Sequence, residues 1–191
     1  EETKKRAYER IITESKRMNK MVQNMLIIAK GKEIEEGHHE YVNLNQLLMK
    51  LTKEYEMIIN KEKIELDITD LDAIIYSNEE EIRAIILNLL DNASKYSIDG
   101  KINIALKVDK NAYIVVENKT LPIPDDICVN LFEPFVKYNF GDQKQASSGL
   151  GLYICKELAK KNRGEIYYRI NDDKISFIVE FPLVKVKQIG I

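Results

Sequence analysis

The sequence has no tryptophan, two histidines, four prolines and two cysteines. Cys128 and Cys155 are too few and too unpatterned for a disulfide framework or a zinc site, which suits a reducing cytosol. We expect both to be small buried residues rather than nucleophiles. No apolar run approaches the length of a membrane-spanning helix, and no signal peptide opens the chain. We therefore expect a chain without direct membrane contact.

Length and charge narrow the class further. A chain of 191 residues with 45% hydrophobic content can bury one full core, so one domain with an appendage is expected. The net charge of −2 gives no electrostatic reason to expect a nucleic-acid partner. The first residue is Glu1 rather than Met, and we expect a fragment of a longer protein.

The first 36 residues contain no proline, and their one glycine is Gly31. Apolar and small residues recur there in alternating steps of three and four, at Tyr8, Ile11, Ser15, Met18, Val22, Met25 and Ala29. This heptad seam predicts a long coiled-coil-like helix that needs a partner helix, although packing on its own domain stays an alternative. Residues 37–42 read as a linker, in which His38 and His39 are expected to be exposed.

A helix is predicted from Glu79 to about Ser97, with Asn78 as its N-cap and acidic residues in its first turn. Its buried stripe is Ile82, Ile85, Ile86, Leu89, Leu90 and Ala93. A polar row follows the edge of that stripe: Asn88, Asn92, Lys95 and Tyr96. Two amides and an ammonium in one row could hold an ion and phosphates. Alternatively, the amides are satisfied at the edge of the core and Lys95 is a solvated cation at the helix end.

A second stretch has Gly149 and Gly151 directly before an apolar periodic run. The glycines let the backbone approach a ligand closely, and the helix that follows presents unpaired N–H groups that attract anions. This arrangement predicts a phosphate-binding loop. Taken alone the pattern is weak, because glycine before a helix is often only a turn.

The rest of the chain alternates helix and strand patterns. Asn43 caps a helix that extends to about Asn60. Strands are predicted at 63–68, 73–76, 101–108, 112–117, 165–170 and 174–181. The pattern predicts an α/β two-layer sandwich, in which three helices cover one face of a mixed, largely antiparallel sheet. The long helix would precede this domain at 43–184, and a loose tail at 185–191 would follow it.

Three motifs together resemble a known family. The run Asn88–Ser97 looks like its asparagine box, Leu131–Phe135 like its phenylalanine box, and Gly149–Leu152 like its second glycine box. In this order they resemble the catalytic and ATP-binding domain of two-component sensor histidine kinases, within the superfamily that includes gyrase, MutL and a heat-shock chaperone. The resemblance covers roughly residues 40–184, and it implies the Bergerat-type ATP-binding fold.

The resemblance implies ATP and Mg²⁺ as ligands, with Asn92 as the magnesium ligand. Asn88 stands where related ATPases place a carboxylate base, which suits a kinase that does not activate water. Lys95 would reach phosphate, and Tyr96 would pack on adenine or ribose. The other implied ATP-binding residues are Asn118, Thr120, Ile123, Phe135, Lys137, Ser148, Gly149, Leu150, Gly151 and Leu152.

The chain departs from the family at the first glycine box. The usual Asp-x-Gly-x-Gly would fall on residues 118–122, where Asn118 replaces the aspartate and Thr120 and Pro122 replace the glycines. The amide oxygen of Asn118 could still accept a hydrogen bond from adenine, without charge. Adenine recognition is therefore the weakest part of the resemblance, and it leaves a reduced nucleotide affinity open.

Residues 136–148 follow the phenylalanine box, and they are polar and without periodicity. They predict a mobile lid over the ligand. Lys137 and Lys144 in this segment could contact a triphosphate. Alternatively, both are ordinary solvated lysines.

The resemblance also implies partners. Residues 1–36 resemble the second helix of the dimerisation and phosphotransfer hairpin, and the first helix, which carries the phosphoacceptor histidine, is absent. No catalytic residue is therefore assigned. The intact protein would be a homodimer that signals to a response regulator, and this part would be the cytoplasmic domain of a membrane-anchored bacterial sensor. One alternative is a docking module whose nucleotide site has decayed. Another is an anti-sigma type serine kinase, which the heptad helix disfavours.

Overall fold

The computed structural model describes residues 38–57, 63–138 and 148–184, together with the single positions 8, 11, 15, 18 and 22. The chain divides into two compact units, Glu1–Glu35 and Glu36–Ile191. In the first unit, the five described positions belong to the predicted heptad seam, and each is helical and exposed. Met25 and Ala29 lie outside the described residues, so the continuous long helix stays a prediction.

The second unit is built on a five-stranded sheet with the order β2-β4-β5-β7-β6. Strand β2 pairs parallel with β4, and every other pairing in this sheet is antiparallel, as the sequence predicted. The strands are β2 Lys63–Ile68, β4 Lys101–Val108, β5 Asn111–Lys119, β6 Glu165–Asn171 and β7 Lys174–Pro182. The helices are α2 Leu44–Glu56, α3 Glu79–Tyr96, α4 Asp125–Val129 and α5 Gly151–Lys161.

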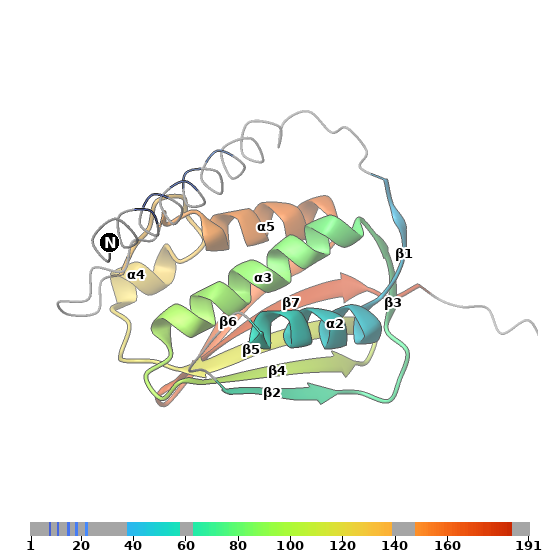
Figure 1. Cartoon of the computed structure of the whole chain (residues 1–191), viewed down its shortest axis with the longest axis horizontal. Coiled ribbons are helices and arrows are strands. Elements are labelled where there is room, and N and C mark those ends of the chain that lie inside the picture. The colour runs from blue at the N-terminus through green and yellow to red at the C-terminus, as the bar shows by residue number, and fades with distance from the viewer. Residues whose placement is uncertain are drawn as a thin grey trace, which may run out of the picture. The chain divides into compact units, whose positions relative to one another are not determined.

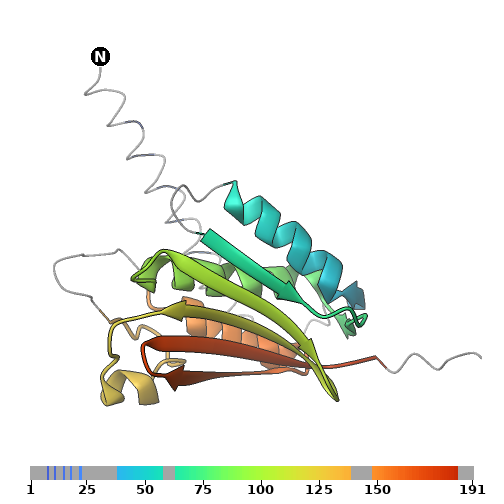
Figure 2. The ribbon, with the colours of Figure 1, turned by 90° about the horizontal axis from the view of Figure 1, so that it is seen from below.

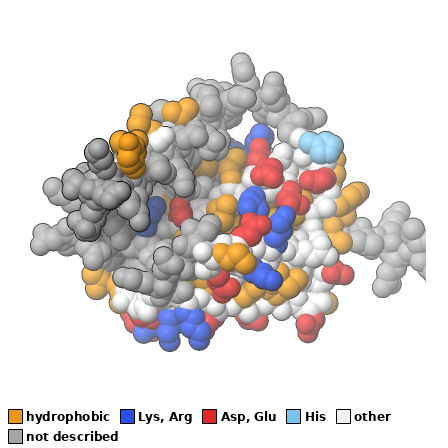
Figure 3. All heavy atoms as spheres, viewed as in Figure 1, with side chains coloured by type: hydrophobic (Ala, Val, Ile, Leu, Met, Phe, Trp, Pro, Cys, Tyr) orange, Lys and Arg blue, Asp and Glu red, His pale blue; other side chains and the backbone are white. Residues whose placement is uncertain are grey.

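Helices α2, α3 and α5 lie together on one face of this sheet (Figures 1 and 2). The stripe predicted for α3 is the centre of the core, since its six members are fully buried and the helix contacts β4 and β5. The solvent side of these helices carries acidic and basic side chains interspersed (Figure 3). Among the described helices, none is both long and apolar enough to cross a membrane.

Both predicted N-caps are confirmed. The Asn78 side chain accepts a hydrogen bond from the Glu81 amide at 3.0 Å, which starts α3 after a residue in an extended conformation. The Asn43 side chain accepts from the Gln46 amide at 3.1 Å and starts α2. Helix α2 ends at Glu56, earlier than the predicted Asn60, with Met57 as its C-cap.

Two elements differ from the sequence predictions. Residues 40–43, expected to be linker and helix cap, form the short strand β1, which pairs antiparallel with β3, Ile74–Ser77. Helix α4 follows Pro124 and had no predicted counterpart.

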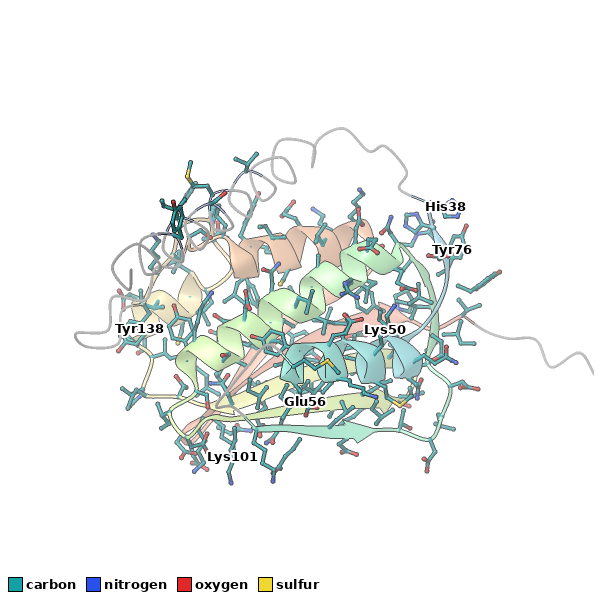
Figure 4. The ribbon with its side chains drawn as sticks, in the orientation of Figure 1. His38, Lys50, Glu56, Tyr76, Lys101 and Tyr138 are labelled. Atoms are coloured by element: carbon teal, nitrogen blue, oxygen red, sulfur yellow. The ribbon has the colours of Figure 1, made fainter. Side chains whose placement is uncertain are left out.

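The pairing of β1 with β3 brings one of the two histidines, His39, next to an aromatic residue of β3. The His39 ring is half-buried and lies 5.7 Å from the ring of Tyr76, which in turn lies 5.4 Å from Tyr41. His38 remains exposed, at the same end of the molecule as Tyr76 (Figure 4). The expectation of exposure is therefore confirmed for His38 and wrong for His39.

The face of the sheet opposite the helices carries a charged network centred on Glu117. Its carboxylate accepts hydrogen bonds from Lys174 Nζ at 2.8 Å, Ser176 Oγ at 2.8 Å and Asn103 Nδ2 at 3.4 Å. Burial alone would raise the pKa of Glu117, but these three donors outweigh it and hold the pKa below its ordinary value. Lys174 shows the matching effect, since its pKa is raised by the hydrogen bond to Glu117.

We expect Glu117→Gln to lower the free energy of unfolding by about 1 kcal/mol at pH 7, because the charged hydrogen bonds to Lys174 are lost. A lowered pKa in the folded state stabilises the protein above the unfolded pKa of about 4.3, and this gain is lost as the pH falls through the folded pKa. Urea unfolding from pH 7 to pH 3 should therefore show the two proteins converging in acid. A difference that stays constant with pH would contradict this explanation.

Candidate functional site

Helices α3 and α5 pack side by side in opposite directions. Near the start of α3, Glu81 contacts Lys161 at the end of α5, with Nζ and Oε1 2.7 Å apart. One turn further along α3, the Ile85 carbonyl accepts from Cys155 Sγ at 3.7 Å. Because the two helices are antiparallel, the second half of α3 lies next to the N-terminus of α5 and extends past it. This half of α3 carries the predicted polar row.

The N-terminus of α5 is open. Leu150 is its N-cap residue, is buried, and makes no side-chain capping bond. The backbone amide of Leu150 donates a hydrogen bond to Ser148 Oγ at 3.3 Å, and this bond holds the end of the loop that leads into α5. The first amides of α5 therefore lack a capping side chain, and helix N-termini of this kind attract anions.

The polar row of α3 faces this helix end. A Cβ atom placed on Gly151 would lie 3.8 Å from Asn88 Oδ1, so the row and the glycine loop are direct neighbours. Asn88 and Asn92 are half-buried, and no side-chain hydrogen bond ties either amide to another described residue. This favours a ligand-binding function for the two amides over the alternative of satisfied amides at the edge of the core. Lys95 is exposed and Tyr96 half-buried.

Asn92 supplies a single neutral oxygen ligand, so a hard divalent cation bound there would need further oxygen ligands from another molecule. The described residues contain no group of three or more His, Cys, Asp or Glu side chains that could hold a metal ion by themselves. An amide oxygen is a suitable ligand for Mg²⁺, which commonly takes one or two protein ligands and completes its octahedron with substrate phosphates and water. The residues present therefore fit a magnesium ion that arrives with a phosphate compound.

The phenylalanine box is bound to the glycine loop through the backbone. The Phe135 amide donates to the Gly149 carbonyl at 2.8 Å. Phe135 has a φ of 67° and Gly149 a φ of 71°, a region that favours glycine. Phe135 is 65% exposed. The two ends of the predicted lid are thus fastened together, while residues 139–147, including Lys144, lie outside the described residues.

A further contact links the start of the lid to the first glycine box. Tyr138, labelled beside α4 in Figure 4, donates its hydroxyl to the Pro122 carbonyl at 3.3 Å. Lys137 next to it is exposed. Ile123 is half-buried, and its carbonyl accepts from Cys128 Sγ at 3.7 Å.

The first glycine box contains unsatisfied polar atoms. Asn118 is 3% exposed and Thr120 is 5% exposed. Asn118 Nδ2 donates to the Lys119 carbonyl at 2.9 Å, but Asn118 Oδ1 and Thr120 Oγ1 have no hydrogen-bond partner within the described part of the chain. Buried polar atoms without partners are costly, so a water molecule or ligand that bonds to them would stabilise the site.

The end of α3 reaches this second group of residues. The Ile98 amide, two residues after α3, donates to the Lys119 carbonyl at 3.1 Å. The predicted site residues therefore form one connected group: the polar row of α3, the start of α5, the phenylalanine box and the end of β5. Leu152 lies half-buried in the first turn of α5.

The cysteines are structural in character. Cys155 is completely buried between α3 and α5, as predicted. Cys128 is half-buried, so the expectation of a buried residue is wrong at this position. Partial burial together with the nearby Asp125 and Asp126 raises the pKa of its thiol. A raised pKa disfavours the thiolate, which is the reactive form.

One buried residue that joins the start of α3 to the end of α5 was missed at the sequence level. Asn162, directly after α5, is 2% exposed. Its Oδ1 accepts from Ser77 Oγ at 2.6 Å and from the Asn78 amide at 3.0 Å. Its Nδ2 donates to Glu81 Oε2 at 2.7 Å and to the Leu158 carbonyl at 2.9 Å. In the sequence, Asn162 before Arg163 and Gly164 indicates the end of a helix. No neighbouring residue indicates that its side chain bonds to the start of α3.

Comparison with known proteins agrees with this arrangement. The family described as histidine kinase-, DNA gyrase B-, and HSP90-like ATPase matches residues 77–185. The histidine protein kinase SaeS of Staphylococcus aureus is 31% identical over 170 residues, which are 85% of this chain and 48% of that protein. Sensor protein DltS of Streptococcus agalactiae is 26% identical over 182 residues, 93% of this chain and 46% of that protein.

A solved structure shares the fold. The histidine kinase AdeS of Acinetobacter baumannii superposes with a TM-score of 0.75 at 21% identity, over 92% of this chain and 83% of that chain. The chain spans about half the length of the curated relatives it matches. Because the family match covers more than half of the sequence and includes the α3 and α5 segments, this chain belongs to the histidine kinase-, DNA gyrase B-, and HSP90-like ATPases.

Proposed function

We propose that this domain binds ATP together with Mg²⁺ in the site formed by α3, the start of α5 and the end of β5, and that it presents the γ-phosphoryl group to a histidine outside this sequence. The observation that supports the proposal most directly is the pair of amides, Asn88 and Asn92, beside an uncapped helix N-terminus. An open helix end attracts phosphate, and a neutral amide is a suitable ligand for a cation that phosphate also holds.

The contribution of the protein would be positioning and charge neutralisation. Phosphoryl transfer needs little covalent chemistry from the protein, and most of the acceleration comes from orientation and electrostatic stabilisation. The Gly151 and Leu152 amides would orient the phosphates, and Asn92 would orient the metal. Asn88 offers no basic group near the phosphates, so a water molecule there would not be activated for hydrolysis.

The outer residues would complete the site. Lys95 and Lys137 are exposed and carry the positive charge needed to meet a triphosphate. The ring of Tyr96, half-buried near the end of α3, would pack against the base or the ribose. Phe135 and Gly149 would hold the ends of the lid, whose residues 139–147 include Lys144.

We infer the wider assembly from the relatives, which are named as sensor proteins and histidine kinases. The full protein would be a membrane-anchored sensor that has this domain in the cytoplasm. It would form a homodimer through a hairpin whose second helix is residues 1–36, and it would pass the phosphoryl group to a response regulator. The exposed seam positions Tyr8, Ile11, Met18 and Val22 support the helical pairing.

Calorimetric titration tests the site. The parent chain should bind ATP more tightly with Mg²⁺ than with EDTA, because the metal links the phosphates to Asn92. In Asn92→Ala we expect the gain from Mg²⁺ to fall by about tenfold or more, since mutation of groups that hold or orient a metal costs about this much in affinity. Asn171→Ala removes an exposed amide from β6 and should change neither titration.

The same titrations separate the proposal from the main alternative. Thr120 and Pro122 stand where the family has glycines, which would suit a docking module with a decayed nucleotide site. That alternative predicts no heat of binding for the parent chain with or without Mg²⁺. If Mg²⁺ instead raises the ATP affinity of the parent and of Asn92→Ala by the same factor, then the chain binds nucleotide but Asn92 does not bind the metal.

A further inference from the structure

We propose that the face of the five-stranded sheet opposite helices α2, α3 and α5 binds the same face of a second copy of this chain, with the strands of the two copies running in opposite directions. This face, called the open face below, has a central row that consists of Ala105, Val115, Ile178 and Tyr167. In Figure 2 the strands lie in front of α3 and α5, so the open face is turned toward the viewer. The proposal goes beyond nucleotide binding and does not depend on it.

The two central strands of the sheet have the sequence pattern of strands that are covered on both faces. A sheet with one solvated face normally alternates apolar and polar residues, whereas strands buried on both faces carry continuous apolar runs. Strand β5 contains the run 114–116, Ile-Val-Val, and β7 contains the run 177–179, Phe-Ile-Val. The helices cover one side of these runs, and the middle residue of each run, Val115 or Ile178, belongs to the open face.

The central row has an apolar middle and polar neighbours, as protein interfaces do. Ile178 is only 6% exposed although it lies on the face without helices, and Val115 beside it is half-buried. Tyr167 is also half-buried, and the guanidinium carbon of Arg169 lies 5.7 Å from the centre of its ring. A flat partner would therefore contact the side chains of Val115 and Tyr167 and meet charged groups around them.

The rows on either side of the central row are complementary to each other. One row consists of Asn103, Glu117, Ser176 and Arg169. The other row consists of Lys107, Tyr113, Glu180 and Glu165. A half turn about an axis along the central row places each strand over its own copy in the opposite direction and exchanges these two rows. Arg169 then faces Glu165 of the second copy, and Glu117 faces Tyr113, whose hydroxyl can donate to a carboxylate.

Stacking the two copies with their strands in the same direction is less favourable. It would bring one row of the open face onto its own copy, namely the row that contains Lys63, Lys101, Lys119 and Lys174. Three of these lysines already contact carboxylates of their own chain, which are Glu65, Asp173 and Glu117. This arrangement would therefore add repulsion between the copies and no new ion pair, so charge complementarity favours strands in opposite directions.

Sedimentation equilibrium of the full chain tests the proposal in a Met18→Glu background. Met18 is 67% exposed in the heptad seam, and a charge there disfavours pairing through residues 1–36. The Met18→Glu chain should still form a reversible dimer through the open face. Adding Val115→Lys should weaken this dimer by about tenfold or more, because the ammonium group would be buried without a partner. The matched control is Met49→Lys on α2, where the side chain is 51% exposed, and it should leave the dimer unchanged.

A charge exchange tests the direction of the strands. Arg169→Glu and Glu165→Arg should each weaken the dimer by about fivefold or more, because each places like charges opposite each other at two symmetric positions. The double variant should restore the parent affinity. Within one chain these residues lie four positions apart on β6, roughly 13 Å, which is too far for them to restore each other.

Three results would overturn the inference. The first is a Met18→Glu chain that stays monomeric up to millimolar concentration, because the open face would then not bind a second copy. The second is an equal effect of Val115→Lys and Met49→Lys, with circular dichroism showing that both variants are folded. The third is a double charge variant that associates as weakly as the two single variants, which would exclude the pairing of opposed strands.

Discussion

Replacing Gly149 by alanine should destabilise the domain by about 2 to 4 kcal/mol and abolish nucleotide binding. A Cβ atom at this position would lie 2.8 Å from the Phe135 carbonyl carbon and 2.8 Å from the Val136 carbonyl oxygen. Both contacts are with backbone, which cannot turn aside as a side chain can. The φ of 71° adds a conformational cost for any residue with a side chain. Urea unfolding and ATP titration measure the two effects.

Gly151→Ala is the matched control. Its Cβ atom would meet only Asn88 Oδ1 at 3.8 Å, an ordinary contact, and Gly151 is the first residue of α5. We expect its stability to stay within about 0.5 kcal/mol of the parent. Its ATP affinity should still fall by about tenfold, because the added methyl group stands where phosphate would approach the backbone. Equal destabilisation by the two substitutions would contradict the assignment of separate structural and ligand-binding roles.

Asn162→Ala should lower the free energy of unfolding by about 2 to 4 kcal/mol, since it removes a buried amide that makes four hydrogen bonds. The loss leaves the Ser77 hydroxyl and the Asn78 amide without their acceptor at the start of α3. Chemical unfolding followed by circular dichroism measures the change.

The control for Asn162 is Lys161→Ala, which removes the neighbouring ion pair with Glu81 and leaves the amide in place. The Lys161 side chain is 35% exposed, so this change should cost less than about 1 kcal/mol. If Lys161→Ala were as damaging as Asn162→Ala, the ion pair rather than the amide would hold the two helices together.

Elements with strong local signals were predictable from the sequence. Helix α3 has an N-cap, an acidic first turn and an uninterrupted apolar stripe, and the structure agrees at each of these points. Strand β1 lacked such a signal, because its four residues, Glu40–Asn43, alternate too briefly and gain their order only by pairing with β3. Helix α4 has five residues, too few for a periodic pattern to emerge.

The site also contains parts that the sequence predicts and parts that it does not. The amides of α3 and the glycines before α5 could be found because each lies in a recognisable local pattern. The link from Gly149 to Phe135 could not, since a positive φ at a phenylalanine is imposed by the loop around it. The orientation of the Asn118 amide depends on the neighbouring carbonyl, and three of the four hydrogen-bond partners of Asn162 lie about 80 residues away in sequence.

The distribution of polar ties along α3 and α5 has a mechanical consequence. Among the described residues, Asn162, Glu81 and Lys161 join the two helices by hydrogen bonds and an ion pair at one end, whereas Asn88 and Gly151 at the opposite end are only neighbours. Local opening of a structure costs least where few polar bonds must break. We therefore expect the two helices to separate at a lower free energy at the Gly151 end than at the Asn162 end.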